Sequence, residues 1–211
     1  MPTRVKSPQK LRMEIAAVAA KIIAAESVAD YHSAKRKAAI QLGLAPNKNM
    51  PSNQEIENAL INYQTLFQPD MQWGQLKALR LQAIQAMKML HQYKPLLVGP
   101  VATGTATSSS EIVLHLYSDQ VEQIGLFLAE QGISNKICEK HIRINATKTV
   151  IYPAYRFIAD QTAIMLVIFS ENDKNLSPVS SINNKAMLML SLDEVTEIAK
   201  DSGDWVAGRF L

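Results

Sequence analysis

The chain has 211 residues, 47% of them hydrophobic and 19% charged, which is enough apolar mass for the core of one domain or of two small ones. Residues 1–8 contain no apolar run of the kind that begins a secretion signal, and the apolar stretch 15–25 is too short to span a bilayer. The single cysteine, Cys138, excludes an internal disulfide and a thiolate metal site. We therefore expect a cytoplasmic protein with no membrane partner.

The net charge of +3 is unevenly distributed along the chain. Residues 1–95 contain 13 Lys and Arg against 6 Asp and Glu, whereas residues 96–211 contain 9 against 13. A basic first half can bind nucleic acid or an acidic partner protein, although such charges more often form the solvated faces of helices. The candidates for such a contact are three consecutive residues, the basic triplet Lys35, Arg36 and Lys37.

The first 94 residues are predicted to form helices and little else. Apolar residues recur at intervals of three and four along most of this region, which is the spacing of one helix face. Ser52 and Glu55 have the spacing of a capping box and therefore mark the start of a helix. Helices are expected at residues 11–26, 29–42, 52–67 and 70–94.

From Pro95 onward, short β-branched runs alternate with helical patterns, so residues 95–211 are predicted to form an α+β domain. The run 164–169 has no polar member and is typical of a central strand buried on both faces, whereas Pro153 predicts an edge or a bulge. Asp119 and Glu122 have the spacing of a second capping box. Strands are expected at 96–98, 112–117, 136–144, 150–157 and 163–169, and helices at 119–128 and, after a Ser191 cap, at 192–200.

A glycine-bearing segment follows the first predicted strand. Its glycines would let the backbone N–H groups approach a phosphate closely. The segment fits neither the Walker pattern nor the dinucleotide-binding fingerprint, and two glycines between strands are more often a plain turn. Four residues of this segment, the glycine turn, are the predicted nucleotide-binding residues: Gly99, Pro100, Gly104 and Thr105.

The strand after the glycine turn carries the candidate catalytic and metal-binding residues. Glu111 and His115 lie on one face of this strand because side chains alternate along it, and Asp119 follows beyond its end. A Glu, a His and an Asp could bind a single metal ion, with Glu111 and His115 acting in catalysis and Glu111 and Asp119 as metal ligands. The alternative is structural, because a lone strand histidine is usually a packed residue and Asp119 has the position of a helix cap.

This arrangement resembles the core of the nucleotidyltransferase superfamily, in which a helix, a strand, a Gly-Ser or Gly-Gly turn and a strand bearing Asp-x-Asp or Asp-x-Glu follow in order. The resemblance implies a mixed sheet with flanking helices, and it implies magnesium and a nucleoside triphosphate as ligands. The sequence departs from the pattern, because Pro100 follows Gly99, Val113 stands at the second carboxylate position, and strand 163–169 has no third acid. A single acid cannot hold two divalent ions, so the standard transfer is not expected.

The chain is also similar to a small bacterial family that joins an N-terminal helical region to such a core. Members of this family are labelled nucleotidyltransferase-like or, in some cases, UDP-N-acetylmuramate–alanine ligase. The ligase label does not fit, because the glycine-rich ATP loop ending in Gly-Lys-Thr/Ser is absent from this sequence. The similarity is carried by residues 30–39, 51–60, 95–101 and 114–117.

Three functions follow from these observations. The first is a nucleotidyltransferase-like protein with a degenerate metal site, which binds a nucleotide or another phosphorylated ligand through the glycine turn without standard catalysis. The second is an active nucleotidyltransferase with a rearranged site made of Glu111, His115 and Asp119. The third is a regulatory module that binds nucleic acid or a protein partner through the basic triplet.

Overall fold

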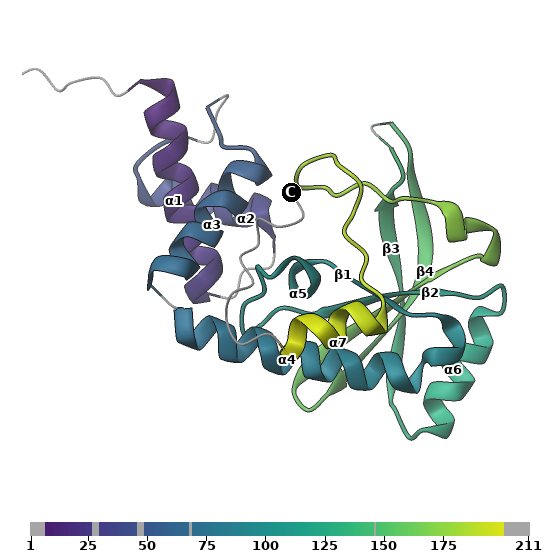
Figure 1. The fold of residues 1–211 in the computed structure, drawn as a ribbon. Coiled ribbons are helices and arrows are strands. Elements are labelled where there is room, and N and C mark those ends of the chain that lie inside the picture. Colours follow the sequence, from purple (N-terminus) through teal and green to yellow (C-terminus); the bar gives the residue numbers. More distant parts are fainter. Residues whose placement is uncertain (1–6, 27–29, 46–48, 68, 146, 201–211) are drawn as a thin grey trace, which may run out of the picture. The chain divides into compact units, whose positions relative to one another are not determined.

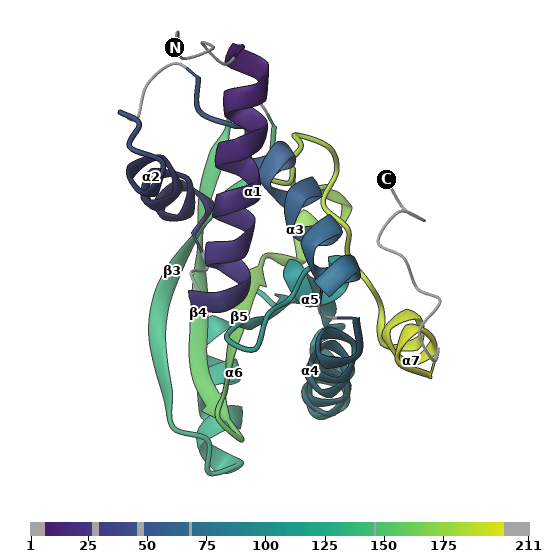
Figure 2. The same cartoon turned by 90° about the vertical axis from the view of Figure 1, so that its left-hand side faces the viewer.

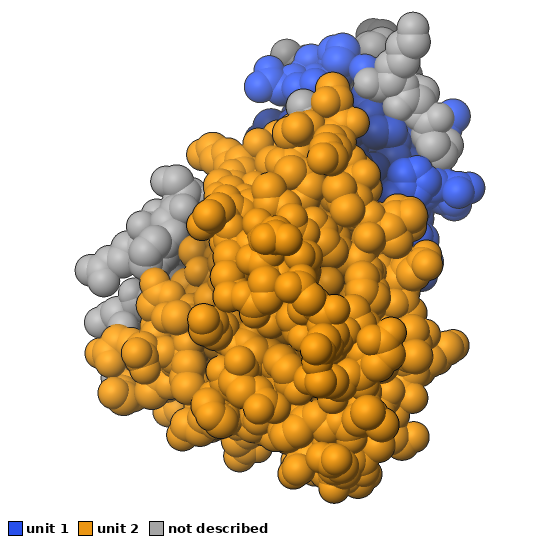
Figure 3. All heavy atoms as spheres, turned by 90° about the vertical axis from the view of Figure 1, so that its right-hand side faces the viewer, with its two compact units in different colours: residues 1–72, 107–109 blue, residues 73–106, 110–211 orange. Residues whose placement is uncertain are grey.

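The computed structural model describes residues 7–26, 30–45, 49–67, 69–145 and 147–200. The chain divides into two compact units, which Figure 3 shows in different colours. Unit 1 comprises residues 1–72 and 107–109, and unit 2 comprises residues 73–106 and 110–211. The predicted class, α+β with a helical first part, is confirmed. No helix in the described ranges combines the length and the apolar character needed to cross a membrane.

Unit 1 contains three helices in its described part, α1 (Pro8–Glu26), α2 (Tyr31–Gln41) and α3 (Asn53–Phe67). The predicted capping box at the start of α3 is confirmed, because the Glu55 N–H donates to Ser52 Oγ and the Ser52 N–H donates to Glu55 Oε2. Many side chains between the helices are small or β-branched, which lets the helices approach closely. The core contains Ile15, Ala16, Ala19, Ala20, Ile22, Ile23, Ala34, Ala38, Ile56 and Leu60.

Unit 2 is built on a five-stranded sheet with the order β1-β2-β5-β4-β3 (Figures 1 and 2). Strands β2 and β5 are parallel, and all other neighbours are antiparallel. The strand predicted to be central, β5, is central. Pro153 lies in the part of β4 that no longer pairs with β5, as a residue without an N–H requires. The strands are β1 (Leu96–Val98), β2 (Ile112–Tyr117), β3 (Asn135–Arg143), β4 (Thr149–Ala159) and β5 (Thr162–Phe169).

The two faces of this sheet have different surroundings. One face, with Leu114, Leu166 and Phe157, packs against α4 (Pro69–Met89), α6 (Val121–Glu130) and α7 (Leu192–Lys200) in the largest hydrophobic core. The opposite side, which we call the second face, forms a separate cluster to which no helix side chain of the described residues contributes. By strand register, the second face carries Val113, His115 and Tyr117 on β2, Met165, Val167 and Phe169 on β5, Tyr152, Ala154 and Arg156 on β4, and Lys136, Cys138 and Lys140 on β3.

Helix α4 belongs to unit 2 from Trp73 onward, so the two units divide earlier than the predicted boundary at residue 94. The reason is its apolar stripe, which packs into the core of unit 2 from Leu76 to Leu90. The fully buried Arg80 connects this helix to its neighbours, because its Nε donates to the Val101 carbonyl and its Nη1 to the Ile198 carbonyl. Burial lowers the pKa of Arg80 to about 10. Helices α4 and α7 lie side by side in Figures 1 and 2.

Two local predictions for unit 2 have different outcomes. The predicted cap of α7 is confirmed, since Ser191 accepts from the Glu194 N–H and Glu194 accepts from the Ser191 N–H. The predicted capping box at Asp119 is wrong, because α6 follows Gln120 without a side-chain cap. The Asp119 carboxylate instead accepts from Ser170 Oγ at 2.7 Å and from the Glu171 N–H at 3.1 Å, because the parallel pairing of Tyr117 with Phe169 brings the end of β5 beside it.

Candidate functional site

The predicted glycine turn contains a short helix that the sequence did not predict. Gly99 has φ +74° and ψ −157°, a conformation that residues other than glycine rarely adopt. Pro100 then begins a one-turn helix, α5 (Pro100–Thr103), where its fixed φ is favourable and its missing N–H costs nothing. Gly104 closes the helix with φ +87° and donates to the Pro100 carbonyl. The turn is therefore rigid, and its shape depends on both glycines.

Only some of the predicted nucleotide-binding residues of the turn are accessible at the surface. Thr105 is buried and lies 3.0 Å from Thr103 through their hydroxyl oxygens, so it serves the local structure. Gly99, Pro100 and Gly104 are half-buried. A phosphate could therefore approach the half-buried residues, but not Thr105.

The sheet brings the glycine turn close to Glu111. Val98 at the end of β1 pairs with Val113 of β2, so Gly99 and Pro100 continue alongside the residues that begin β2. Helix α5 packs against both strands. The turn and Glu111 consequently lie at the same end of the sheet, whereas Asp119 lies past the other end of β2.

The carboxylate of Glu111 is occupied by an arginine that sequence reasoning missed. Arg156 Nε donates to Glu111 Oε1 at 2.7 Å, with 56% of the Arg156 side chain and 22% of the Glu111 side chain exposed. Met165 of β5 pairs with Val113 on one side and with Arg156 on the other, so the arginine reaches across β5. The available signal was weak: Arg156 is the lone charge in a predicted strand, but its partner lies on a strand far away in sequence.

His115 is a packed residue of the second face. It is 1% exposed, and its ring centroid lies 4.6 Å from that of Phe169. Burial, with a smaller effect of the Lys140 charge, lowers the pKa of His115 to about 4, so the imidazole is neutral at neutral pH. Three residues also lie between it and Glu111, which places the two about 13 Å apart along the chain. The structure therefore does not bring these two predicted catalytic groups together.

The expected magnesium does not fit the residues at this end of the sheet. Glu111 is paired with a cation, Val113 offers no ligand, and β5 has no acid. Asp119 is bound to Ser170 and the Glu171 backbone beyond the far end of β2. Among the residues that the structure describes, no three His, Cys, Asp or Glu side chains gather into a group that could hold a metal ion.

The second face carries cations in place of metal ligands. Lys136 of β3 lies directly opposite Arg156, and Lys140 follows two pleats further along β3. Lys136 is exposed and Lys140 is half-buried. No Asp or Glu occupies a second-face position within the five described strands. Towards the Lys140 end of this face, the Asp173 carboxylate accepts from Tyr152 Oη at 3.0 Å. An anion is therefore favoured only at the other end, beside Arg156 and Lys136.

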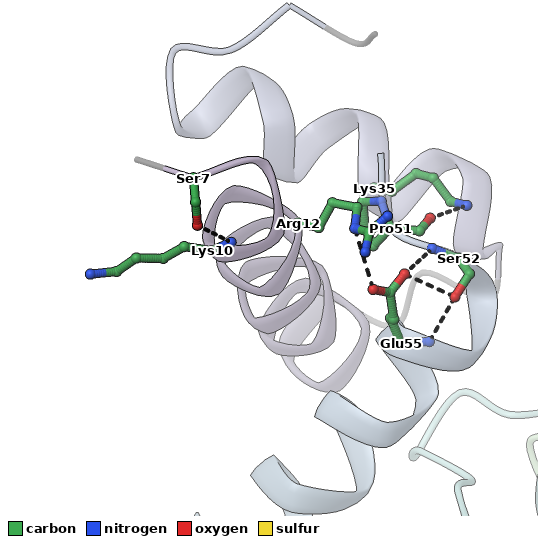
Figure 4. A network of polar contacts seen from close by, with 7 residues as sticks. All are labelled: Ser7, Lys10, Arg12, Lys35, Pro51, Ser52 and Glu55. Carbon is green, nitrogen blue, oxygen red and sulfur yellow. Dashed lines mark hydrogen bonds and ion pairs between the residues drawn. The ribbon is translucent and has the colours of Figure 1, made fainter. Parts of the chain in front are cut away.

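The basic triplet is divided by its contacts within unit 1. Figure 4 shows Lys35 Nζ donating to the Pro51 carbonyl, at 3.0 Å. Lys35 Nζ also donates to Asn53 Oδ1 at 3.0 Å and so attaches α2 to the start of α3. Figure 4 also shows the adjacent Glu55, which accepts from Ser52 and lies 3.5 Å from Arg12 Nε. The bonds from Ser52 are the main reason that the pKa of Glu55 is lowered. Arg36 and Lys37 are exposed, so the triplet does not act as one basic surface.

Compared with models of known protein families, the chain matches none, and a search of the curated proteins finds no significant relative. A functional proposal for this chain therefore rests on the motif spacing and on the geometry of the second face.

Proposed function

We propose that unit 2 is a nucleotidyltransferase-like domain that binds a phosphorylated ligand, with a nucleoside triphosphate as the reference compound, on the second face beside the glycine turn. The ligand is bound and not turned over. One observation carries the proposal: the only acid at the expected metal position, Glu111, is held by Arg156 at 2.7 Å.

The order of elements supports the nucleotidyltransferase-like part of the proposal. Helix α4, strand β1, the glycine turn and strand β2 follow one another, and β5 lies beside β2 as a parallel central strand. The superfamily pattern has the same succession of helix, strand, glycine turn, acid-bearing strand and later central strand. In that pattern the ligand triphosphate lies at the turn and the acids, which here corresponds to Gly99 and Glu111.

The charges support binding without transfer. In a nucleotidyltransferase, metal ions oppose the charge of the phosphates and stabilise the charge that develops during transfer. Here Arg156 and Lys136 would oppose that charge, with no metal ion required. A general base is also lacking at this position, because His115 is buried about 13 Å away along the strand.

Neither of the alternative functions is favoured by the geometry. A rearranged transferase needs Glu111, His115 and Asp119 to act on one ligand, and they are spread along the whole of β2. A basic contact surface on α2 needs the triplet to point outward, and Lys35 is bound to Pro51 and Asn53.

The proposal is tested by thermal unfolding of the full chain with ATP, GTP, CTP and UTP, each with magnesium and with EDTA. A ligand that binds only the folded state stabilises it by about 2.7 kcal/mol at roughly one hundred times its Kd. We expect at least one triphosphate to raise the Tm in EDTA by at least as much as with magnesium, and Arg156→Gln to abolish the rise. Arg36→Gln, which removes the same charge from α2, is the matched control and should retain the rise.

Two results would contradict the proposal. One is the absence of a Tm shift with every triphosphate. The other is pyrophosphate release that requires magnesium and disappears in Glu111→Ala, which would establish the active transferase instead.

A further inference from the structure

We propose that Glu111 is a positioning residue for Arg156: it holds the guanidinium by its Nε, so that the outer edge with Nη1 and Nη2 receives a phosphate group together with Lys136. This inference rests on the proposed function and specifies which groups bind the phosphate and in which ionic form. Glu111 was expected to be a catalytic residue and a metal ligand. In this proposal it binds neither a metal nor the ligand and acts only on Arg156.

The hydrogen bond to Glu111 uses only the Nε of the Arg156 guanidinium. The carboxylate accepts from Nε, and within the described ranges Arg156 has no other hydrogen-bond partner. More than half of the Arg156 side chain is exposed. Because the guanidinium is planar and rigid, fixing Nε also fixes the direction of the two terminal nitrogens, which form the edge that binds phosphate oxygens in pairs.

Lys136 supplies the second cation. It lies directly opposite Arg156 in the antiparallel β3–β4 pair, where side chains are about 5 Å apart at the Cβ atoms. Like charges at directly opposite positions destabilise a sheet, so an anion between them would relieve a cost that the free protein carries. The second-face positions of the five described strands offer no acid to do this, and Glu111 is engaged at Nε.

The ligand chemistry follows from this charge balance. A terminal phosphate or a pyrophosphate group has enough oxygen acceptors for both the arginine edge and the lysine. A magnesium ion on the same oxygens would be repelled by the two cations, and the adjacent carboxylate, Glu111, is already paired with Arg156. The preferred form is therefore the metal-free phosphate, carried by a nucleotide or by a smaller phosphorylated molecule.

Calorimetric titration of the full chain in EDTA, with pyrophosphate and separately with ATP, tests the inference. We expect Arg156→Gln to weaken binding about tenfold or more, as the loss of a charge-assisted hydrogen bond does, and Lys136→Gln to weaken it severalfold. Arg156→Lys should also weaken binding, because it keeps the charge but loses the planar edge. Lys148→Gln, in the exposed β3–β4 loop, is the control for the loss of one positive charge and should bind normally.

The decisive comparison is between Glu111→Gln and Glu111→Ala. Both remove the negative charge, but only glutamine keeps an acceptor for Arg156 Nε. A positioning role predicts about fivefold weaker binding by Glu111→Ala than by Glu111→Gln, which corresponds to one hydrogen bond of about 1 kcal/mol. A merely structural role would lower the Tm of Glu111→Ala without this difference in affinity.

The outcomes separate the inference from the proposed function. If the two Glu111 variants have the same Kd, the inference is wrong and the proposed function stands. If the wild type binds phosphates and Arg156→Gln binds them equally, the inference is wrong and so is the placement of the ligand on the second face. If magnesium tightens pyrophosphate binding, the metal-free preference is wrong. If the wild type binds neither pyrophosphate nor any nucleotide, the proposed function fails and the inference fails with it. ATP binding without pyrophosphate binding would place recognition on the nucleoside and overturn the inference alone.

Discussion

Acidification is predicted to destabilise unit 2 through His115. Burial lowers the pKa of His115 to about 4, against an ordinary value of 6.5 in the unfolded chain. Between these two values the unfolded state binds a proton that the folded state does not, so stability is complete above about pH 6.5 and is lost as the pH falls towards 4. The difference amounts to about 3 kcal/mol at most, since each pKa unit corresponds to about 1.4 kcal/mol. That is a large part of the stability of a typical domain.

The assay is urea unfolding of the wild type and of His115→Gln between about pH 7 and pH 4.5. The variant has no titrating group at this position but keeps a side chain of similar size beside Phe169. Groups elsewhere titrate equally in both proteins, so the difference between the two curves isolates His115. We expect the wild type to lose stability faster than the variant as the pH falls. Parallel curves over this range would refute the view that His115 is buried in its neutral form.

Three further predictions concern other elements. Gly125→Ala should destabilise the protein by about 1–3 kcal/mol in urea unfolding, because a Cβ at this position would lie 2.6 Å from Tyr155 Oη. The matched control is Gly74→Ala, whose Cβ would meet open space and which should stabilise α4 by about 0.5–1 kcal/mol. Glu57→Gln should raise the Tm at neutral pH, since burial raises the pKa of Glu57 and penalises its ionised form. The increase in Tm should shrink as the pH falls towards 4.5, and an increase that is independent of pH would contradict this cause. Gly99→Ala should cost about 1 kcal/mol or more, because φ is +74° there, and an unchanged Tm would show that the turn tolerates other conformations.

Local patterns in the sequence were sufficient for much of the fold. The all-apolar run of β5 predicted a central strand, and the spacing of Ser52 and Glu55 predicted the start of α3, because each signal depends on residues within a few positions of one another. The prediction of a capping box at Asp119 was wrong because it, too, depended only on local spacing. Its spacing to Glu122 fits a capping box, but Ser170, far along the chain, binds the same carboxylate.

The candidate site could be predicted only in part. The glycine turn and Glu111 were found because they lie on consecutive elements of a recognisable pattern. The partner of Glu111 was missed because Arg156 becomes its neighbour only when β5 inserts between β2 and β4, and no local signal specifies that insertion. The same insertion of β5 decides that Glu111 lies beside the pair formed by Arg156 and Lys136.

The strand order also has a kinetic consequence. Strands β3, β4 and β5 are consecutive antiparallel partners and can pair as soon as each hairpin closes, and β1 and β2 form a second local pair. The parallel contact between β2 and β5 joins these two pieces, and contacts so distant in sequence form slowly. Glu111 belongs to one piece and Arg156 to the other, so their ion pair forms only after the two pieces have joined. A folding intermediate that contains only these two pieces would have both residues but not their ion pair. Recovery of the phosphate binding that we propose would therefore report the final closure of the sheet during refolding.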